Sequence, residues 1–359
     1  MNAIMLTRRT ILASPLVAAS RPAWASTMAR SALLKNYADA PGLVAVSLQG
    51  VSKDMAFHGA AAAGWNGETV FAIASLSKVF TALLLADMVE RGKVAMDDTV
   101  EKYLPQGVTI APFEGKAVRL ADLVTYTPGL PGWPKNLKPL DPVKPFPAYT
   151  QDDLYAALSQ GALKYPPGTH YTYSNFGFGL LGHVLARRGG KSLDEMFLTC
   201  ICTPLGMTST RITLTQAMRA RLAPGHDNKR QPVAVWEMPE TFGGAGGLFS
   251  TANDMSRFLE AATGRGQSAL SRAFSTLPQL RRPADKPETM AAQGWFVSTR
   301  KGSELVWKDG ATVGYSSFMG YAPQGGAGLI LLTNGMCGNT LTPLGKHLLD
   351  TGYAFPEPQ

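Results

Sequence analysis

The sequence has 359 residues, of which 45% are hydrophobic and 17% are charged. This composition is typical of a soluble protein with a sizeable core, and the length suits one large unit or two closely joined lobes. No segment reaches the roughly 18 uninterrupted apolar residues that span a bilayer, which argues against an integral membrane protein. The net charge is +8, but no dense run of Lys or Arg follows residue 25, which argues against a nucleic-acid partner.

The first 25 residues have the pattern of a signal peptide. Paired arginines at 8–9 precede an apolar stretch at 11–19, and an Ala-Trp-Ala triplet at 23–25 allows cleavage before Ser26. An amphipathic first helix is the alternative, but this stretch contains no acidic residue. The sequence therefore predicts a periplasmic or secreted protein, exported with or without the twin-arginine route. We expect no stable membrane anchor after cleavage.

The N-terminal half combines strands with a long helical region. Strands are predicted at 43–49 and 55–59, where apolar and β-branched residues are frequent, and a helix is predicted at 79–91. Residues 93–150 are broken by Pro and Gly, and seven prolines at 128–147 indicate an ordered surface loop. Further helical patterns lie at 151–160, 176–188, 192–202 and 252–263.

The C-terminal part returns to short strands after a linker-like stretch at 264–292, and it ends in a predicted helix at 341–351. The simplest packing is one antiparallel sheet built from both chain ends, flanked by helices, with an all-helical lobe inserted. We assign 26–80 and 290–359 to the α/β sheet lobe and 81–289 to a mainly helical lobe that carries active-site loops. The C-terminal strands are predicted at 294–299, 304–308, 315–322 and 328–334.

Ser75 and Lys78 form a Ser-x-x-Lys box at the start of the predicted helix. Positions i and i+3 share a helix face, so the lysine amine can reach the serine hydroxyl and, when partly desolvated, accept its proton. The alternative is that Ser75 only caps the helix. Ser298 and Lys301 match the same box, but Lys301 precedes a glycine and is better interpreted as part of a strand-ending turn.

Two further boxes carry groups for proton transfer and substrate binding. Tyr173 and Asn175 follow a Pro-Pro-Gly turn; the phenol could shuttle protons if cations lower its pKa, and the amide could hold a carbonyl or orient a lysine. Lys308 and Gly310 end a predicted strand, where the amine could supply a cation and the glycine could admit a substrate backbone. The alternatives are a buried aromatic with a capping asparagine, and an exposed β-turn.

The order of the three boxes resembles that of the penicillin-recognising serine hydrolases: class C β-lactamases, low-molecular-weight D,D-peptidases and β-lactamase-like carboxylesterases. The Tyr-x-Asn form is closer to class C. The resemblance covers roughly residues 40–350 and implies the β-lactamase/transpeptidase-like fold. Beyond the boxes it rests on Leu120–Pro131, Pro166–Gly182, Pro204–Met207 and Lys308–Ser317.

This resemblance implies a role for each residue. Ser75 would be the nucleophile, and Lys78 and Tyr173 would share the proton transfers. The backbone N–H groups of Ser75 and Ala311 would form the oxyanion hole. Asn175 and Lys308 would bind substrate and adjust the pKa of Tyr173. Asp309 and Gly310 would also belong to the substrate-binding residues.

Three departures from the family pattern affect substrate choice. Asp309 replaces the hydroxyl residue of Lys-Thr-Gly that in many relatives helps bind a substrate carboxylate, and its charge should weaken carboxylate binding. The glycine-rich loop at Gly243–Gly247 lacks the class C tyrosine. Gly132-Trp133 stands near the place of a polar amide residue. These departures make a dedicated β-lactamase a weaker expectation than the boxes suggest.

Gly177–Gly182 fits a GxGxxG pattern, but no strand precedes it, so close helix packing is the better interpretation. No His/Cys spacing indicates a metal site, and we expect no cofactor.

The leading hypothesis is a class C-type serine hydrolase that cleaves β-lactam or D-Ala-D-Ala-type amide bonds in the cell envelope. Its partner would be a small molecule or a peptidoglycan peptide. The alternatives are a carboxylesterase for short-chain esters and a catalytically silent penicillin-binding sensor.

Overall fold

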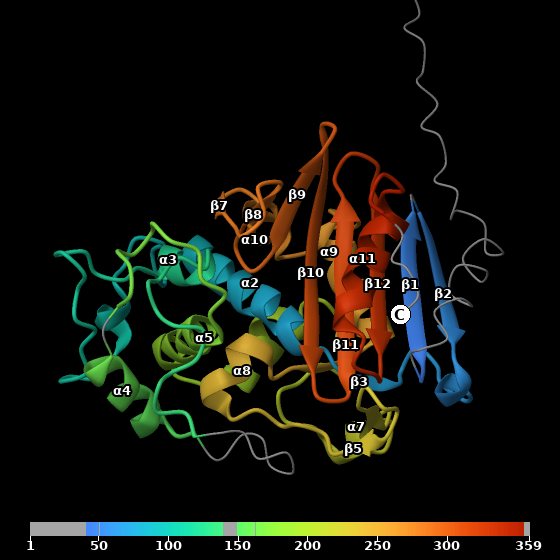
Figure 1. The fold of residues 1–359 in the computed structure, drawn as a ribbon, viewed down its shortest axis with the longest axis horizontal. Helices are drawn as coiled ribbons and strands as arrows, with labels where there is room; N and C mark the ends of the chain where they lie inside the picture. Colours follow the sequence, from blue (N-terminus) through green and yellow to red (C-terminus); the bar gives the residue numbers. More distant parts are fainter. Residues whose placement is uncertain (1–40, 50, 139–148, 162, 355–359) are drawn as a thin grey trace, which may run out of the picture.

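The computed structural model describes residues 41–49, 51–138, 149–161 and 163–354. An eight-stranded antiparallel sheet lies at its centre, in the order β2-β1-β12-β11-β10-β9-β8-β7 (Figure 1). Both ends of the described chain contribute strands, as predicted. The strands are β1 (Leu43–Gln49), β2 (Ser52–His58), β7 (Arg282–Pro283), β8 (Thr289–Ala291), β9 (Phe296–Arg300), β10 (Ser303–Thr312), β11 (Tyr315–Ala322) and β12 (Ala327–Thr333).

The two middle strands β11 and β12 are buried over almost their whole length. Helix α11 (Gly338–Leu349) packs on β10, β11 and β12, and α9 (Ala252–Ala262) packs on β1 and β12 from the opposite face (Figure 1). A strand with both faces covered reads as a continuous apolar run rather than as an alternation, as in AGLILLT of β12. The predicted antiparallel sheet with flanking helices is thus confirmed.

The chain between β2 and β7 is mainly helical and packs beside the sheet (Figure 1). Its central helix α2 is buried from Ser77 to Met88, which explains why its sequence is apolar on all sides. Two short strand pairs, β3 with β6 and β4 with β5, lie outside the main sheet. The elements are β3 (Val70–Ala72), α2 (Ser77–Glu90), α3 (Leu120–Val124), α4 (Gln151–Gln160), α5 (Asn175–Gly189), α6 (Leu193–Phe197), α7 (Gln216–Arg219), β4 (Gly225–His226), β5 (Pro232–Val233), α8 (Glu240–Gly246), β6 (Phe249–Thr251) and α10 (Ser271–Thr276).

The glycine-rich segment 243–247 was predicted as a loop, and this is wrong: most of it belongs to α8. Its small residues allow α8 to lie directly against α5. A Cβ on Gly182 would come within 3.1 Å of the Gly244 Cα, and one on Gly179 within 2.5 Å of the Thr241 carbonyl oxygen. The helix-packing interpretation of the GxGxxG pattern is therefore confirmed.

The stretch 264–292 is not a linker, contrary to the prediction, because it contains α10, β7 and β8. Leu270, Phe274 and Leu277 are buried there, so apolar residues fix the segment to the core despite its glycines and prolines. The predicted signal peptide lies outside the described residues, as does part of the proline-rich loop. Within the described ranges, none of the helices has the length and apolarity to cross a bilayer.

Strand β10 passes directly beside the turn that precedes α2. A Cβ on Gly310 would stand 2.6 Å from the Ile73 carbonyl oxygen and 2.9 Å from the Ser75 backbone nitrogen. The Ser317 hydroxyl on β11 donates to the same Ile73 oxygen at 2.9 Å. The glycine therefore sets how closely the sheet approaches the start of α2.

We expect Gly310→Ala to destabilise the fold by about 1–3 kcal/mol, because the new methyl group would overpack a backbone contact that cannot move freely. Gly325→Ala is the matched control, since a Cβ there meets no atom within 4 Å, and its effect should stay within about 0.5 kcal/mol. Thermal denaturation of both variants measures the difference. Equal melting temperatures would show that the contact is not tight in solution.

Candidate active site

Ser75 lies on a tight turn between β3 and α2. Ala74 has a φ of +47°, which is uncommon for a residue with a side chain, and Ala74–Leu76 form a single 3-10 turn. The Ser77 hydroxyl holds the turn by donating to the Ala74 carbonyl at 2.7 Å and accepting from the Leu248 N–H at 3.0 Å. Ser75 makes no side-chain cap to the helix. The alternative of a simple capping serine is therefore wrong.

Lys78, the second residue of α2, is completely buried, and its amine makes three hydrogen bonds. It donates to the Ser75 hydroxyl at 3.1 Å, to the Asn175 side-chain oxygen at 2.7 Å and to the Ala245 carbonyl at 2.6 Å. Burial disfavours the charged form and lowers the pKa of Lys78 to about 8. A lysine with this pKa can exist as a free amine near neutral pH and accept a proton from the serine.

Tyr173 lies between two lysine amines. The Nζ atoms of Lys78 and Lys308 are 4.8 and 4.9 Å from the centroid of its ring. Burial by itself would raise the pKa of the phenol, but the two positive charges and a hydrogen bond from Ser75 outweigh it and lower the pKa to about 8. The structure thus brings the predicted tyrosine together with the predicted nucleophile and both predicted lysines.

Asn175 is the first residue of α5, but it does not cap the helix. The cap is Ser174, whose hydroxyl accepts from the Gly177 N–H at 2.9 Å and donates to the Pro131 carbonyl at 2.6 Å. The capping alternative for the asparagine is therefore wrong. Its amide oxygen orients Lys78 instead, which was the other possibility.

The Lys308 box lies inside β10, not at its end, because the strand continues to Thr312. The exposed-turn alternative is therefore wrong. Lys308 is fully buried, and Ala311 is exposed on the same strand. Gly310 allows β10 to contact the Ser75 turn, a role that was not predicted from its sequence.

Asp309 is bound on both sides by the protein itself. One carboxylate oxygen lies 3.2 Å from the Lys308 amine, and the other accepts from the Thr342 hydroxyl of α11 at 2.8 Å. Burial would raise the pKa of this carboxyl, but the lysine charge and the threonine hydrogen bond outweigh burial and lower it. Burial would lower the pKa of Lys308, but the charges of Tyr173 and Asp309 outweigh burial and raise it, so this lysine stays a cation.

A cavity of about 490 Å³ adjoins Asp309. Thr342 and Lys346 line it from α11, and Trp307 lines it from β10. The Lys346 amine lies 3.8 Å from a ring centroid of Trp307, and burial lowers the pKa of this lysine to about 8. Thr342, Lys346 and the Ala245 carbonyl were not predicted from the sequence, because no local motif marks them.

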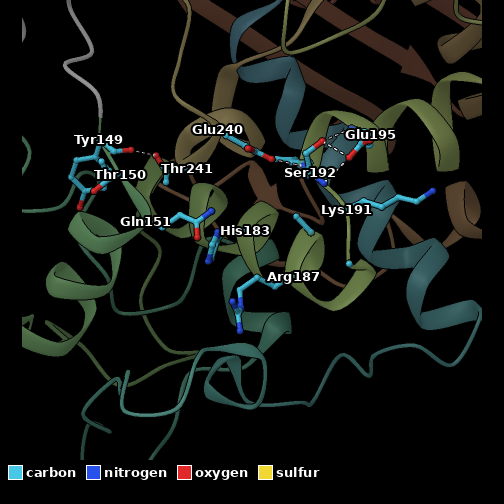
Figure 2. Close-up of a pocket in the computed structure, with 13 residues that line it drawn as sticks. Tyr149, Thr150, Gln151, His183, Arg187, Lys191, Ser192, Glu195, Glu240 and Thr241 are labelled. Carbon is cyan, nitrogen blue, oxygen red and sulfur yellow. Dashed lines mark hydrogen bonds between the residues drawn. The ribbon is translucent and has the colours of Figure 1, made fainter.

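A second cavity, of about 580 Å³, lies between α4, α5, α6 and α8 (Figure 2). None of the predicted site residues lines it. Its acidic side chains serve the backbone: Glu240 accepts from the Leu193 N–H at 2.7 Å, and Glu195 accepts from the Ser192 N–H at 3.0 Å. We therefore place the candidate chemistry at Ser75 and not in the larger cavity.

Trp133 is another departure from the family pattern. Trp133 is 36% exposed, and its ring meets that of Phe242 edge-on at 5.2 Å.

The second Ser-x-x-Lys box does not bring its serine and lysine together in the way that Ser75 and Lys78 meet. Ser298 is fully buried and accepts from the Trp307 indole at 2.9 Å, while Lys301 lies in the turn after β9. The interpretation of Lys301 as a strand-ending turn is confirmed.

Comparisons with known proteins identify the family of this chain. The family model described as Beta-lactamase matches residues 31–350. The D-alanyl-D-alanine-carboxypeptidase/endopeptidase AmpH of Escherichia coli (strain K12) is 28% identical over 339 residues, which cover 84% of this chain and 83% of AmpH. A β-lactamase of Lysobacter lactamgenus is 27% identical over 305 residues, which cover 75% of this chain and 74% of that protein.

Solved structures agree on the fold. A class C β-lactamase from Rhodobacter sphaeroides superposes with a TM-score of 0.75 at 24% identity, covering 90% of this chain and 98% of that one. Since the family model spans most of the sequence, this chain belongs to the β-lactamase family, within the penicillin-recognising serine hydrolases.

Proposed function

We propose that this chain is a serine hydrolase that forms an acyl-enzyme on Ser75 and cleaves amide bonds of β-lactams or D-Ala-D-Ala-type peptides. The observation that carries the proposal is the Lys78 amine, which is buried, has a lowered pKa and lies 3.1 Å from the Ser75 hydroxyl. The relative AmpH is a D-alanyl-D-alanine-carboxypeptidase/endopeptidase and the Lysobacter relative is a β-lactamase, which supports the amide substrates.

The reaction needs only groups of this chain and water. The Lys78–Tyr173 pair removes the hydroxyl proton while the Ser75 oxygen attacks the substrate carbonyl carbon. The resulting oxyanion is directed at the backbone N–H groups of Ser75 and Ala311. As the bond to the leaving group breaks, Tyr173 gives that group the proton. Water then attacks the ester on Ser75 and gives one proton to the pair, which passes a proton to the Ser75 oxygen as the ester bond breaks. The acid leaves, and the serine hydroxyl is restored.

A carboxylesterase is the second candidate, and Asp309 favours it. This carboxylate already occupies the Lys308 amine and the Thr342 hydroxyl, which are donors that a substrate carboxylate would otherwise use. An ester without a carboxylate loses nothing from this arrangement. A silent penicillin-binding sensor is disfavoured, because Ser75, Lys78 and Tyr173 are all present and in contact.

We expect Ser75→Ala to abolish labelling by a fluorescent penicillin and hydrolysis of a short-chain nitrophenyl ester. Ser298→Ala should keep both reactions but lose about 1–3 kcal/mol of stability, because it leaves the buried Trp307 indole N–H without its acceptor. Labelling, ester kinetics and intact mass on both variants check this.

The wild-type protein separates the candidate functions in the same assays. Turnover of penicillin, or of a D-Ala-D-Ala peptide assayed beside it, supports amide hydrolysis. Ester turnover without penicillin labelling supports the esterase, and stable labelling without turnover of penicillin, peptide or ester supports the sensor. An acyl adduct on the Ser75→Ala protein would exclude Ser75 as the nucleophile.

The Lys78–Tyr173 pair predicts a pH dependence. Both groups have a pKa of about 8, and the reaction requires the pair to have lost one proton. The kcat/KM for a neutral ester should therefore rise about tenfold per pH unit below pH 7 and level off above about pH 8. A flat or falling profile of kcat/KM between pH 5.5 and 8 would contradict this assignment.

Tyr173→Phe should fold normally and lose about 100- to 10,000-fold in turnover.

Asp309→Thr should raise kcat/KM for penicillins by about tenfold or more, equal to about 1.4 kcal/mol, because it frees Lys308 for a substrate carboxylate. Neutral nitrophenyl esters should change much less. Asp285 lines the cavity that adjoins Asp309, and Asp285→Asn removes a negative charge there without changing the contact between Asp309 and Lys308. This control should have a smaller effect on penicillins. Steady-state kinetics on both substrates decide the matter. An equal change for both substrates, or a fall for penicillins, would show that Asp309 does not oppose carboxylates.

A further inference from the structure

Tyr126 is a fully buried tyrosine with an unusual backbone conformation. Its φ is +61°, a region that bulky side chains rarely adopt, and its exposure is 0%. It follows α3 directly, and its hydroxyl donates to the Gly294 carbonyl at 3.2 Å. Burial raises its pKa well above the ordinary value, so it stays neutral and does not compete for the proton of Tyr173.

The ring of Tyr126 packs against three aromatic rings that lie near the amines of Lys78 and Lys308. It stacks on Tyr173 with centroids 5.4 Å apart and on Phe296 with centroids 5.6 Å apart, and it packs on Phe178 at 4.8 Å. The Lys78 amine lies over Tyr173 and Phe178, and the Lys308 amine lies over Tyr173 and Phe296.

The Tyr126 hydroxyl also reaches the backbone of α2 through Gly294. The Gly294 N–H donates to the Val124 carbonyl at 3.2 Å, so both sides of this residue are bound to the segment that carries Tyr126. Gly294 has a φ of +72°, and a Cβ there would come within 2.7 Å of the Lys78 carbonyl oxygen. The contact places one residue between Tyr126 and the backbone of the catalytic lysine.

We propose that Tyr126 is a positioning residue that holds the ring of Tyr173 between the amines of Lys78 and Lys308. The inference rests on the proposed function, in which Tyr173 transfers protons. The attraction between a cation and a phenolate falls with distance and with the entry of water. A small displacement of a reacting group can cost on the order of a hundredfold in rate. A rigid neutral ring packed against Tyr173 prevents both the displacement of its ring and the entry of water.

The test compares three variants. Tyr126→Leu removes the ring, Tyr126→Phe keeps it, and Tyr321→Leu removes another buried tyrosine that has no ring contact with Tyr173 among the described contacts. The pKa of Tyr173 is measured by ¹³C NMR on tyrosine-labelled protein, with the signal assigned from Tyr173→Phe. Ester kinetics and thermal stability are recorded on the same samples.

We expect Tyr126→Leu to move the measured pKa of Tyr173 from about 8 toward its ordinary value near 10. Its kcat should fall about 10- to 100-fold with little change in KM. Tyr126→Phe should restore the pKa and most of the turnover. Tyr321→Leu should lower the melting temperature without changing the Tyr173 pKa.

An unchanged Tyr173 pKa and kcat in folded Tyr126→Leu would overturn the proposal, as would the same pKa shift in Tyr321→Leu. The proposed function fails by a separate result, namely full activity of Ser75→Ala or Tyr173→Phe. The NMR titration reads the position of Tyr173 without turnover, so the two failures are distinguishable.

Discussion

The site depends on the burial of two lysine amines beside one tyrosine ring. Removing two like charges from water is costly, and each amine must be compensated within the protein. Lys78 is compensated by an amide oxygen, a backbone carbonyl and the serine hydroxyl, and Lys308 is compensated by Asp309. The ring of Tyr173 lies close to both amines, which favours its ionised form. The same charges that are costly to bury thus produce a phenol that can exchange a proton near neutral pH.

Charge compensation also connects the chemistry to substrate choice. Asp309 stabilises the cation of Lys308, but it does so by occupying the donors on that side of the site. A substrate carboxylate must therefore compete with a carboxylate of the protein. Lys346 brings a further amine to the adjoining cavity, where burial lowers its pKa. Under the proposed function, this local balance of charge would separate substrates that carry a carboxylate from those that do not.

Close packing of the backbone fixes the positions of these groups relative to one another. Gly179 and Gly182 let α5, which begins with Asn175, lie against α8, whose Ala245 carbonyl binds Lys78. Gly310 lets β10 approach the Ser75 turn. Three segments far apart in the sequence are thereby held against the start of α2.

Features that depend on local periodicity, such as single strands, single helices and side chains one helical turn apart, can be predicted from the sequence. Apolar runs predict β12 and α2, and the i, i+3 spacing on a helix brings Lys78 to Ser75. Tertiary structure alone decided the contacts of Lys78 with the Ala245 carbonyl, of Asp309 with Thr342, and of Tyr126 with Gly294, which join residues 167, 33 and 168 positions apart. These contacts use backbone carbonyls and side chains that no local motif marks, so they form only when the packed core brings distant segments together.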